Sequence, residues 1–230
     1  RVCAEKYTAV MPESVRRIAP WCAYAALCCR VLGRGSLYQS GGAAGFRDQL
    51  QDRINLLRVD PAGAREHILE CCAHQYAAGD VQHWYHPGGG ETDKGVRTTC
   101  SDDLLWLPWA VCEYVRETGD ESLCRESVPY IDSPPLAPGE KSRYETPALS
   151  GGNGTVLDHC HRAAALVLRR GIGAHRLLLI GGGDWNDAFD DMGANAESVW
   201  LTWFASAVFH KFSALLTRLG EPGADRYETA

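Results

Sequence analysis

Two carboxylates, an indole ring and an amide follow one another in the stretch Gly183–Asp187, which reads Gly-Asp-Trp-Asn-Asp. It comes directly after the apolar run Leu177–Ile180 and two further glycines. An aromatic face can stack on a sugar ring, an amide can bond its hydroxyls, and an acid can protonate a glycosidic oxygen. The stretch therefore predicts a carbohydrate site made of Asp184, Trp185, Asn186 and Asp187.

A cation site or an Asp-rich turn at a helix entry is the alternative reading of the same stretch. An EF-hand loop needs oxygen donors at alternate positions, a Gly at the sixth and a Glu at the twelfth. Ala188 and Asn195 break that register. The EF-hand is thereby disfavoured, but an ordinary turn remains open.

A second set of polar residues lies between Gly95 and Asp103. Arg97 and Asp103 could hydrogen-bond neighbouring hydroxyls of one sugar, because a guanidinium group offers several donors in one plane and a carboxylate is a strong acceptor. Equally, Asp102 and Asp103 could complement the dipole of a helix that starts there, with Arg97 as their partner.

Two further groups have open roles. His83 and Trp84 form either a platform for a saccharide or an anchor for a long loop. The polar run from Arg47 to Asp52 is expected to be a solvated helix face.

Composition excludes several classes of function. The chain has 230 residues, 45% of them hydrophobic, and a formal charge of −6. No Lys/Arg run exceeds two residues, so binding to nucleic acid or to an anionic membrane is not expected. The uninterrupted apolar stretches are shorter than the ~18 residues of a membrane span, and no secretory leader opens the sequence. We therefore expect a cytoplasmic location.

The ten cysteines are expected to be reduced and structural. No Cys-x-x-Cys occurs, and the adjacent pairs Cys28-Cys29 and Cys71-Cys72 fall in helical apolar patterns. His159-Cys160-His161 and the pair His83/His86 are weak metal candidates, since neighbouring residues on one helix point in different directions. No metal site is predicted.

Helical periodicity recurs along the chain and predicts about six helices with hardly any strand. Their apolar stripes run from Ile18 to Leu32, in 46–57, in 64–78, from Leu104 to Val115, from Leu157 to Leu168 and from Leu201 to Leu219. Ser101 is the expected N-cap of the fourth helix, and Thr155 with Asp158 the capping box of the fifth. Helix pairs joined by unequal loops favour an all-α toroid. Residues 80–99, 134–154 and 176–196 are the expected long loops, and such loops are commonly functional.

Five motifs, in order along the chain, resemble the inverting disaccharide phosphorylases of glycoside hydrolase family ninety-four. That family includes cellobiose and chitobiose phosphorylases and the phosphorylase-like region of cyclic β-1,2-glucan synthases. The motifs are Leu37–Asp52, Gly79–Pro87, Gly95–Arg97 with Ser101–Pro108, Gly183–Asp187 and Glu197–Leu201. Ala188 stands where the family usually has Gly, and Thr99 where it usually has a second Arg.

The resemblance implies that residues 1–230 are a single partial catalytic domain, all-α and part of an (α/α)₆ barrel. The C-terminal part of the barrel and the phosphate-binding residues would lie beyond Ala230. Asp187 would be the general acid, and Trp185, Arg97 and Asp103 would line the sugar subsite. No cofactor or metal is implied; inorganic phosphate would be the co-substrate, and the parent protein could be a homodimer.

The expected reaction is inverting phosphorolysis of a β-linked glucosaccharide, of the cellobiose or β-1,2-glucan type, to α-glucose 1-phosphate. Asp187, in a partly buried site, would protonate the leaving oxygen while phosphate attacks from the opposite face. One alternative is an inverting hydrolase with a base among Asp102, Asp103 or Glu197. The other is an inactive, truncated sugar-binding piece.

Overall fold

The computed structural model describes residues 12–31, 41–88, 90–190 and 192–228. Five helices of ten or more residues make up its body: α4 (Phe46–Asn55), α5 (Pro61–Ala73), α6 (Asp103–Thr118), α7 (Val156–Arg170) and α8 (Val199–Leu219). Shorter helices are α2 (Glu13–Arg16), α3 (Ala19–Ala25), η1 (Ala26–Val31), η3 (Glu121–Arg125), η4 (Asp187–Phe189) and α9 (Ala224–Glu228). These long helices confirm the periodicity-based predictions for the segments between residues 46 and 219.

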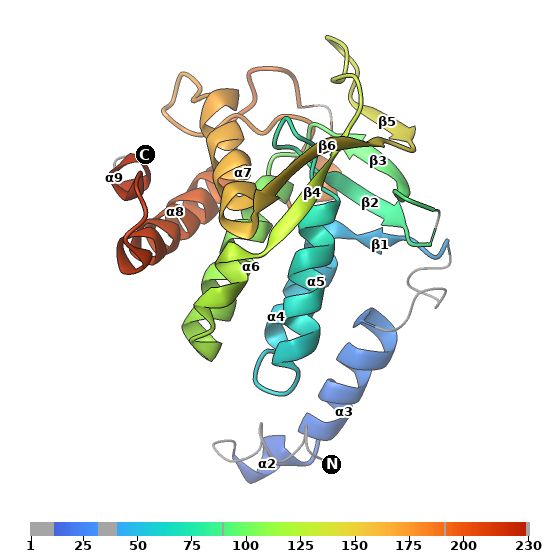
Figure 1. The fold of residues 1–230 in the computed structure, drawn as a ribbon, viewed down its shortest axis with the longest axis vertical. Coiled ribbons are helices and arrows are strands. Elements are labelled where there is room, and N and C mark those ends of the chain that lie inside the picture. The colour runs from blue at the N-terminus through green and yellow to red at the C-terminus, as the bar shows by residue number, and fades with distance from the viewer. Residues whose placement is uncertain (1–11, 32–40, 89, 191, 229–230) are drawn as a thin grey trace.

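Helix α6 is the centre of the packing and lies against α4, α5, α7 and α8 (Figure 1). It is apolar almost all round, and Leu105, Leu107 and Val111 are fully buried. A helix with apolar residues on every side is expected in the interior of a protein. Packing against these four helices therefore holds α6 in place.

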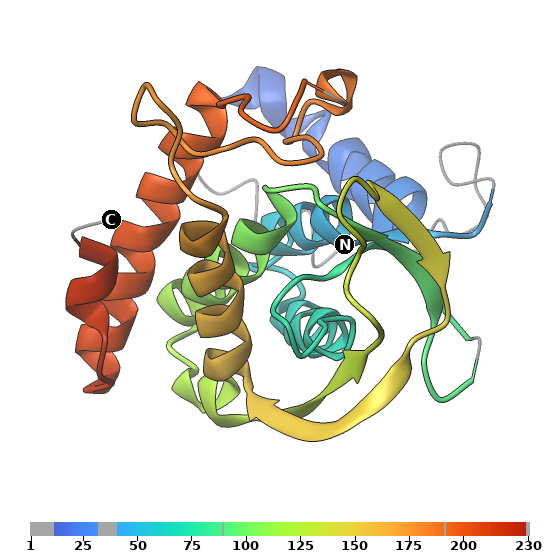
Figure 2. The ribbon, with the colours of Figure 1, turned by 90° about the horizontal axis from the view of Figure 1, so that it is seen from above.

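The prediction of an all-α fold is wrong, because the described chain contains two antiparallel sheets. One has the order β1-β2-β3-β5, from β1 (Ala44–Gly45), β2 (Gln82–His86), β3 (Lys94–Thr98) and β5 (Ser142–Glu145). The other pairs β4 (Ser127–Asp132) with β6 (Ala148–Thr155). Figure 2 shows β6 curving past one end of α5. The described part is a mixed α/β structure rather than a ring of helices alone.

Strands β2, β3 and β5, and nearly all of β6, lie in two of the three segments that were expected to be long loops, 80–99 and 134–154. Their sequences lack the usual composition of strands. Strand β3 reads Lys-Gly-Val-Arg-Thr, and β6 is mostly exposed, with three glycines and an asparagine. Gly and Asn are depleted in strands. The strands form because distant segments pair, such as Val96 with Tyr144 and Val128 with Gly154. Local periodicity does not contain this information.

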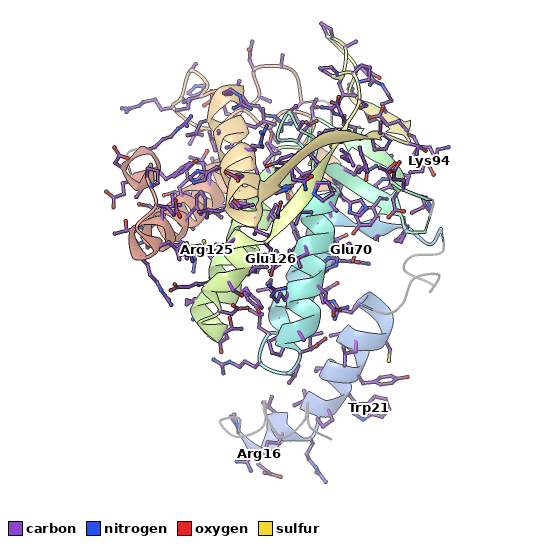
Figure 3. The ribbon with its side chains drawn as sticks, in the orientation of Figure 1. Arg16, Trp21, Glu70, Lys94, Arg125 and Glu126 are labelled. Atoms are coloured by element: carbon purple, nitrogen blue, oxygen red, sulfur yellow. The ribbon has the colours of Figure 1, made fainter. Side chains whose placement is uncertain are left out.

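The first predicted helix forms as α3 and η1, but its apolar stripe does not face the core. Ile18 is 56% exposed and Trp21 is 71% exposed. Trp21 lies on the helix that stands apart from the body of the molecule (Figure 3). The prediction of a core-facing stripe is therefore wrong for these residues, and its expected end at Leu32 and Gly33 lies outside the described residues. The same holds for residues 37–40 of the motif that begins at Leu37.

The N-caps of α6 and α7 were both predicted from the sequence, with different outcomes. Thr155 and Asp158 form the reciprocal capping box of α7, which confirms that prediction. The N-cap of α6 is Asp102 rather than Ser101, and its side chain makes no capping bond. Asp102 is instead committed to other partners, which belong to the site described below.

The described cysteines are free thiols, and Cys71 and Cys72 are fully buried in the core as small apolar residues. Helix α8 is long and apolar enough to cross a membrane by length and composition. In this fold one side of α8 packs on α6 and α9, while Val199 and Trp203 are exposed. Length and composition alone therefore do not assign it to a membrane.

Candidate functional site

The acidic loop and the start of α6 are joined by backbone hydrogen bonds. Ser101 N donates to Gly183 O at 2.9 Å, and Gly182 N donates to Thr99 O at 3.0 Å. On the other side, Arg170 donates to Thr99 O and Cys100 O at 3.1 and 2.8 Å. The turn before α6 thus fixes the loop that carries Asp184–Asp187.

A close backbone approach makes Gly181 necessary at this junction. Its φ is +64°, and a Cβ there would lie 2.4 Å from Thr99 O and 2.7 Å from Ser101 Oγ. Neither neighbour can move freely, because Thr99 O is held by two donors. Gly at this position allows both the left-handed conformation and the contact.

We expect Gly181→Ala to destabilise the domain more than Gly119→Ala and to lower turnover. Gly119 has a similar φ of +73° but open space around its Cβ position. The control therefore measures the left-handed conformation alone, which costs about 1–2 kcal/mol, whereas Gly181→Ala adds the clash with Thr99. Thermal unfolding and activity check this; equal effects of the two substitutions would contradict the close approach.

A cavity of about 340 Å³ opens beside this junction. It lies between the four-stranded sheet and the acidic loop, and strands β2 and β3 and residues 182–190 contribute most of its wall. Its lining residues are His83, Trp84, Val96, Thr98, Cys100, Lys141, Ser142, Gly182, Gly183, Asp184, Asp187 and Asp190. Four residues predicted from the sequence, His83, Trp84, Asp184 and Asp187, share it. A larger hollow of about 520 Å³ near α7 and α9 contains none of the predicted residues.

Asp187 presents its carboxyl group to solvent and to the cavity. Its side chain is 76% exposed, more than the partly buried site that was expected. Arg47 Nη2 donates to Asp187 Oδ1, and this is the one protein contact described for that carboxyl. A carboxyl at a cavity wall with one arginine partner is accessible to a ligand.

Asp184 is buried and organises the loop. Its Oδ1 accepts a hydrogen bond from Asn186 N at 2.9 Å, and its Oδ2 accepts one from Ser198 Oγ at 2.6 Å. Ser198 in turn caps α8 by accepting from Leu201 N. Asn186 caps η4 through Ala188 N. Asp184 and Asn186 therefore set the path of the backbone around Asp187.

Trp185 is 51% exposed and belongs to a group of aromatic rings. Its ring centroid lies 6.4 Å from that of Trp200, which stacks on Phe204 at 5.2 Å. Trp84 on the sheet side contacts Tyr144, with centroids 5.3 Å apart. Exposed rings on both sides of the loop offer apolar faces of the kind that sugars stack on.

His83 on the cavity wall pairs with Asp103, which is buried behind it. His83 Nδ1 lies 2.8 Å from Asp103 Oδ2, and Asp103 is 2% exposed. Asp103 Oδ1 is buried and has no hydrogen-bond partner in the described part of the chain. A buried carboxylate oxygen normally has a donor, so this atom is a natural acceptor for a ligand hydroxyl.

Burial lowers the pKa of His83, but the charge and hydrogen bond of Asp103 outweigh it, and the net result is a raised pKa. We expect Asp103→Asn to reverse this and bring the pKa of His83 below its usual range, because burial and the charge of Arg47 are then opposed only by the charge of Asp102. Nuclear magnetic resonance titration of the His83 ring measures the change. In the wild type this pair stabilises the fold below about pH 6.5, the usual range of His. That stability is lost as the pH rises through the raised pKa of His83.

Asp93→Asn is the matched control for this titration, because Asp93 pairs with a different imidazole, His74. It should leave the pKa of His83 unchanged. A pKa of His83 that does not respond to Asp103→Asn would contradict the described pairing.

Arg97 faces away from the cavity. Its neighbours on β3, Val96 and Thr98, line the cavity, and successive side chains of a strand point to opposite faces. Arg97 is 3% exposed and binds Asp80 through two hydrogen bonds of 2.6 and 2.8 Å. Its guanidinium group also lies 3.9 Å from the centre of the Tyr76 ring. The structure therefore brings Arg97 to the sheet that forms the site but not to the cavity wall.

Arg47 is the site residue that sequence reasoning missed. The expectation of a solvated face is wrong for Arg47, which is 5% exposed. Arg47 Nη1 donates to Asp102 Oδ1 at 3.0 Å and to Asp184 O at 2.9 Å, while Nη2 reaches Asp187. The position of Arg47 in the sequence could have indicated its burial. Arg47 lies on the same helical stripe as Leu50 and Ile54, which are apolar and buried.

Asp102 is the most enclosed carboxylate, with no exposed surface. It accepts hydrogen bonds from Arg47, from Trp106 Nε1 at 2.9 Å and from Cys100 Sγ at 3.2 Å. Burial first, and then repulsion from Asp103, raise its pKa to about 6 in spite of these donors. Burial also raises the pKa of the Cys100 thiol. Glu197, the other acid considered, bonds the backbone of His175 and Leu177 and is absent from the cavity lining.

Comparison with known proteins shows the family to which the chain belongs. Residues 12–229 match the catalytic domain of the glycosyl hydrolase 94 superfamily. The chain is 46% identical over 194 residues to the cyclic beta-(1,2)-glucan synthase NdvB of Rhizobium meliloti (strain 1021), covering 84% of this chain and 7% of that protein.

Two phosphorylases are also similar. Solabiose phosphorylase of Paenibacillus borealis is 31% identical over 184 residues, covering 79% of this chain and 20% of that protein. The 1,2-beta-oligoglucan phosphorylase of Listeria innocua is 25% identical over 224 residues, covering 94% of this chain and 19% of that protein. The chain thus spans a quarter or less of the length of these relatives. Because the match covers nearly the whole chain, this protein belongs to the glycosyl hydrolase 94 superfamily, within its catalytic domain.

Proposed function

We propose that this chain carries the acid side of the catalytic centre of an inverting glycoside phosphorylase. The observation that supports it is the shared cavity, which is lined by the exposed carboxyl of Asp187 and by His83, the partner of the buried Asp103. Inorganic phosphate is the proposed co-substrate, and no further cofactor is required.

In the proposed reaction, Asp187 donates a proton to the glycosidic oxygen as the bond to the anomeric carbon breaks. Phosphate attacks that carbon from the opposite face, which inverts a β-linkage to an α-sugar phosphate. An inverting hydrolase needs a second carboxylate to activate water. Phosphate carries its own negative charge, so one carboxyl group suffices.

The partners of the other acids favour this single-acid scheme. Asp102 is enclosed by Arg47, Trp106 and Cys100, and Glu197 is bonded to backbone. Of the three acids considered as a base, that leaves Asp103, whose Oδ1 is buried and therefore has no contact with solvent water. A hydrolase with Asp103 as base is the remaining alternative.

Arg47 and Asp187 are paired as an arginine and an ionised carboxylate would be. By microscopic reversibility, the ionised form is the one required for synthesis, in which Asp187 takes the proton of the acceptor hydroxyl. For phosphorolysis the proton must be on Asp187, so a bound saccharide must loosen the contact with Arg47.

The sugar itself is proposed to lie between the loop and the sheet, with Trp185 and Trp84 as stacking faces and Asn186 and His83 as polar contacts. Arg97 is proposed to support the sugar site indirectly. It lies on the face of β3 opposite the cavity-lining Val96 and Thr98, and its two bonds to Asp80 hold the strand in place. The substrate class we propose is a β-linked glucosaccharide, with β-1,2-linked glucan favoured by the similarity to the glucan synthase and the oligoglucan phosphorylase.

Three wider proposals accompany this one. Residues 1–230 are part of a single catalytic domain, the parent protein is a homodimer, and the domain works in the reducing cytoplasm. The described free thiols support the last of these.

The test is a product assay on the full-length parent protein, hereafter the full chain, with sophorose, cellobiose and chitobiose, each with and without inorganic phosphate. We expect sugar phosphate from sophorose in the presence of phosphate and almost no free-sugar release in its absence. Cleavage that continues without phosphate would identify the hydrolase instead. The isolated 230-residue piece is expected to be inactive.

A further inference from the structure

Three potential metal ligands from three elements meet at the cavity wall: His83 on β2, Cys100 in the turn after β3, and Asp103 at the start of α6. One ligand atom of each lies within 4.8 Å of the others. The closest pair is His83 Nδ1 and Asp103 Oδ2, 2.8 Å apart. An imidazole nitrogen, a thiol sulfur and a carboxylate oxygen are the three ligand types of protein zinc sites.

The three side chains are built into the protein. Asp103 is 2% exposed and Cys100 is 8% exposed. Asp103 Oδ1 is buried without a hydrogen-bond partner among the described residues, so one coordinating atom is free. His83 and Cys100 both line the 340 Å³ cavity, which gives an ion a route from solvent and leaves room for a water molecule as a further ligand.

The surrounding charge favours a cation. The carboxylates of Asp102, Asp103, Asp184 and Asp187 gather here, and the arginines that face them are Arg47 and Arg170. Asp102 and Asp103 also repel each other. An ion at Asp103 would relieve this repulsion.

Arg47 does not block the site. Its Nη1 donates to Cys100 Sγ at 3.7 Å, while its stronger contacts go to Asp102 and Asp187. A donor that bonds the sulfur from outside stabilises a metal-bound thiolate, as outer-shell hydrogen bonds do.

We propose that His83 Nδ1, Cys100 Sγ and a carboxylate oxygen of Asp103 bind one zinc-like divalent ion, with water completing the coordination. The Cys100 S–H bond breaks and the metal–sulfur bond forms, and the proton leaves to solvent. His83 binds in the tautomer that carries its proton on Nε2. If the proposed phosphorolysis is correct, the ion competes with saccharide for Asp103 and acts as a reversible inhibitor; the binding itself does not depend on that function.

The test is a titration of the metal-stripped full chain with Co²⁺, followed by displacement with Zn²⁺. A cobalt–thiolate bond gives a charge-transfer band in the near ultraviolet and intense visible bands in a four-coordinate site. We expect both bands in the wild type and their loss, with at least tenfold weaker Zn²⁺ binding, in Cys100→Ser. Cys112→Ser is the matched control, because Cys112 is equally buried at 7% but lies far along α6, and it should keep both bands.

Bands that persist in Cys100→Ser, or bands absent from a correctly folded wild type, would overturn the proposal. Circular dichroism establishes that the variants are folded. If Cys100→Ser does not fold, zinc-edge X-ray absorption of the wild type decides the matter. One sulfur at about 2.3 Å among nitrogen and oxygen ligands supports the site, and a shell without sulfur refutes it. Neither readout requires turnover, so failure of the proposed enzymatic function would leave this result interpretable.

Discussion

Asp187→Asn is expected to lower the rate of disaccharide phosphorolysis by about 10²–10⁴-fold, the usual contribution of a positioned general acid. The physical reason is that a sugar alkoxide is a poor leaving group and must take a proton as the bond breaks. Because Asn retains the size of Asp and the carboxyl is 76% exposed, the fold and the sugar affinity should change little. Steady-state kinetics of the full chain with sophorose and phosphate measure the effect.

A substrate with an activated leaving group shows whether Asp187→Asn loses activity because the general acid is missing or because the structure is damaged. A dinitrophenyl β-glucoside has a leaving group that needs no proton, so Asp187→Asn should phosphorolyse it at nearly the wild-type rate. Asp132→Asn, at an exposed position at the end of β4, is the control and should leave both substrates unaffected. Equal losses on the disaccharide and on the activated glucoside would remove Asp187 from the acid role.

Arg47→Met is expected to destabilise the domain by about 3–5 kcal/mol, because it removes the cation from a fully buried carboxylate. Asp102 has no exposed surface, and Arg47 is the arginine that pairs with it. Turnover should fall as well, since Arg47 also holds Asp184 O and contacts Asp187. Thermal or denaturant unfolding of the full chain gives the first quantity and product formation the second.

Two companion variants make this result specific. Arg58→Met removes a surface pair with Glu117 in which the arginine side chain is 62% exposed, and it should cost less than about 1 kcal/mol. Asp102→Asn added to Arg47→Met should recover part of the lost stability, because the buried group no longer carries a charge. If Arg47→Met were as mild as Arg58→Met, Arg47 would not be the buried link between α4 and the acidic loop.

The helices could be predicted because their signals are local. The Thr155–Asp158 capping box and the apolar stripes of α4 to α8 depend on residues three or four apart. The strands could not, since β3 pairs with β5 across more than forty residues and β6 is mostly exposed. As a result, about a third of the residues expected to lie in the three long loops are in strands, 21 of 62.

The residues of the candidate site also divide into those that could be predicted from the sequence and those that could not. The acidic loop was recognisable because Trp185 and Asp187 are unusual together, whatever the fold. The direction of Arg97 depends on strand alternation in a segment that was not recognised as a strand, so its partner Asp80 was not foreseen. Arg47 was foreseeable, because it interrupts the buried stripe that Leu50 and Ile54 continue. The bare oxygen of Asp103 could be found only from coordinates.

The stereochemistry of the first product tests the central claim most directly. Proton and phosphorus nuclear magnetic resonance can follow the full chain, sophorose and phosphate from the earliest turnover. One acid at Asp187 with phosphate as the nucleophile predicts α-glucose 1-phosphate and glucose in equal amounts, both formed at the rate at which phosphate is consumed. A β-phosphate, or free glucose formed while phosphate stays constant, would contradict the account.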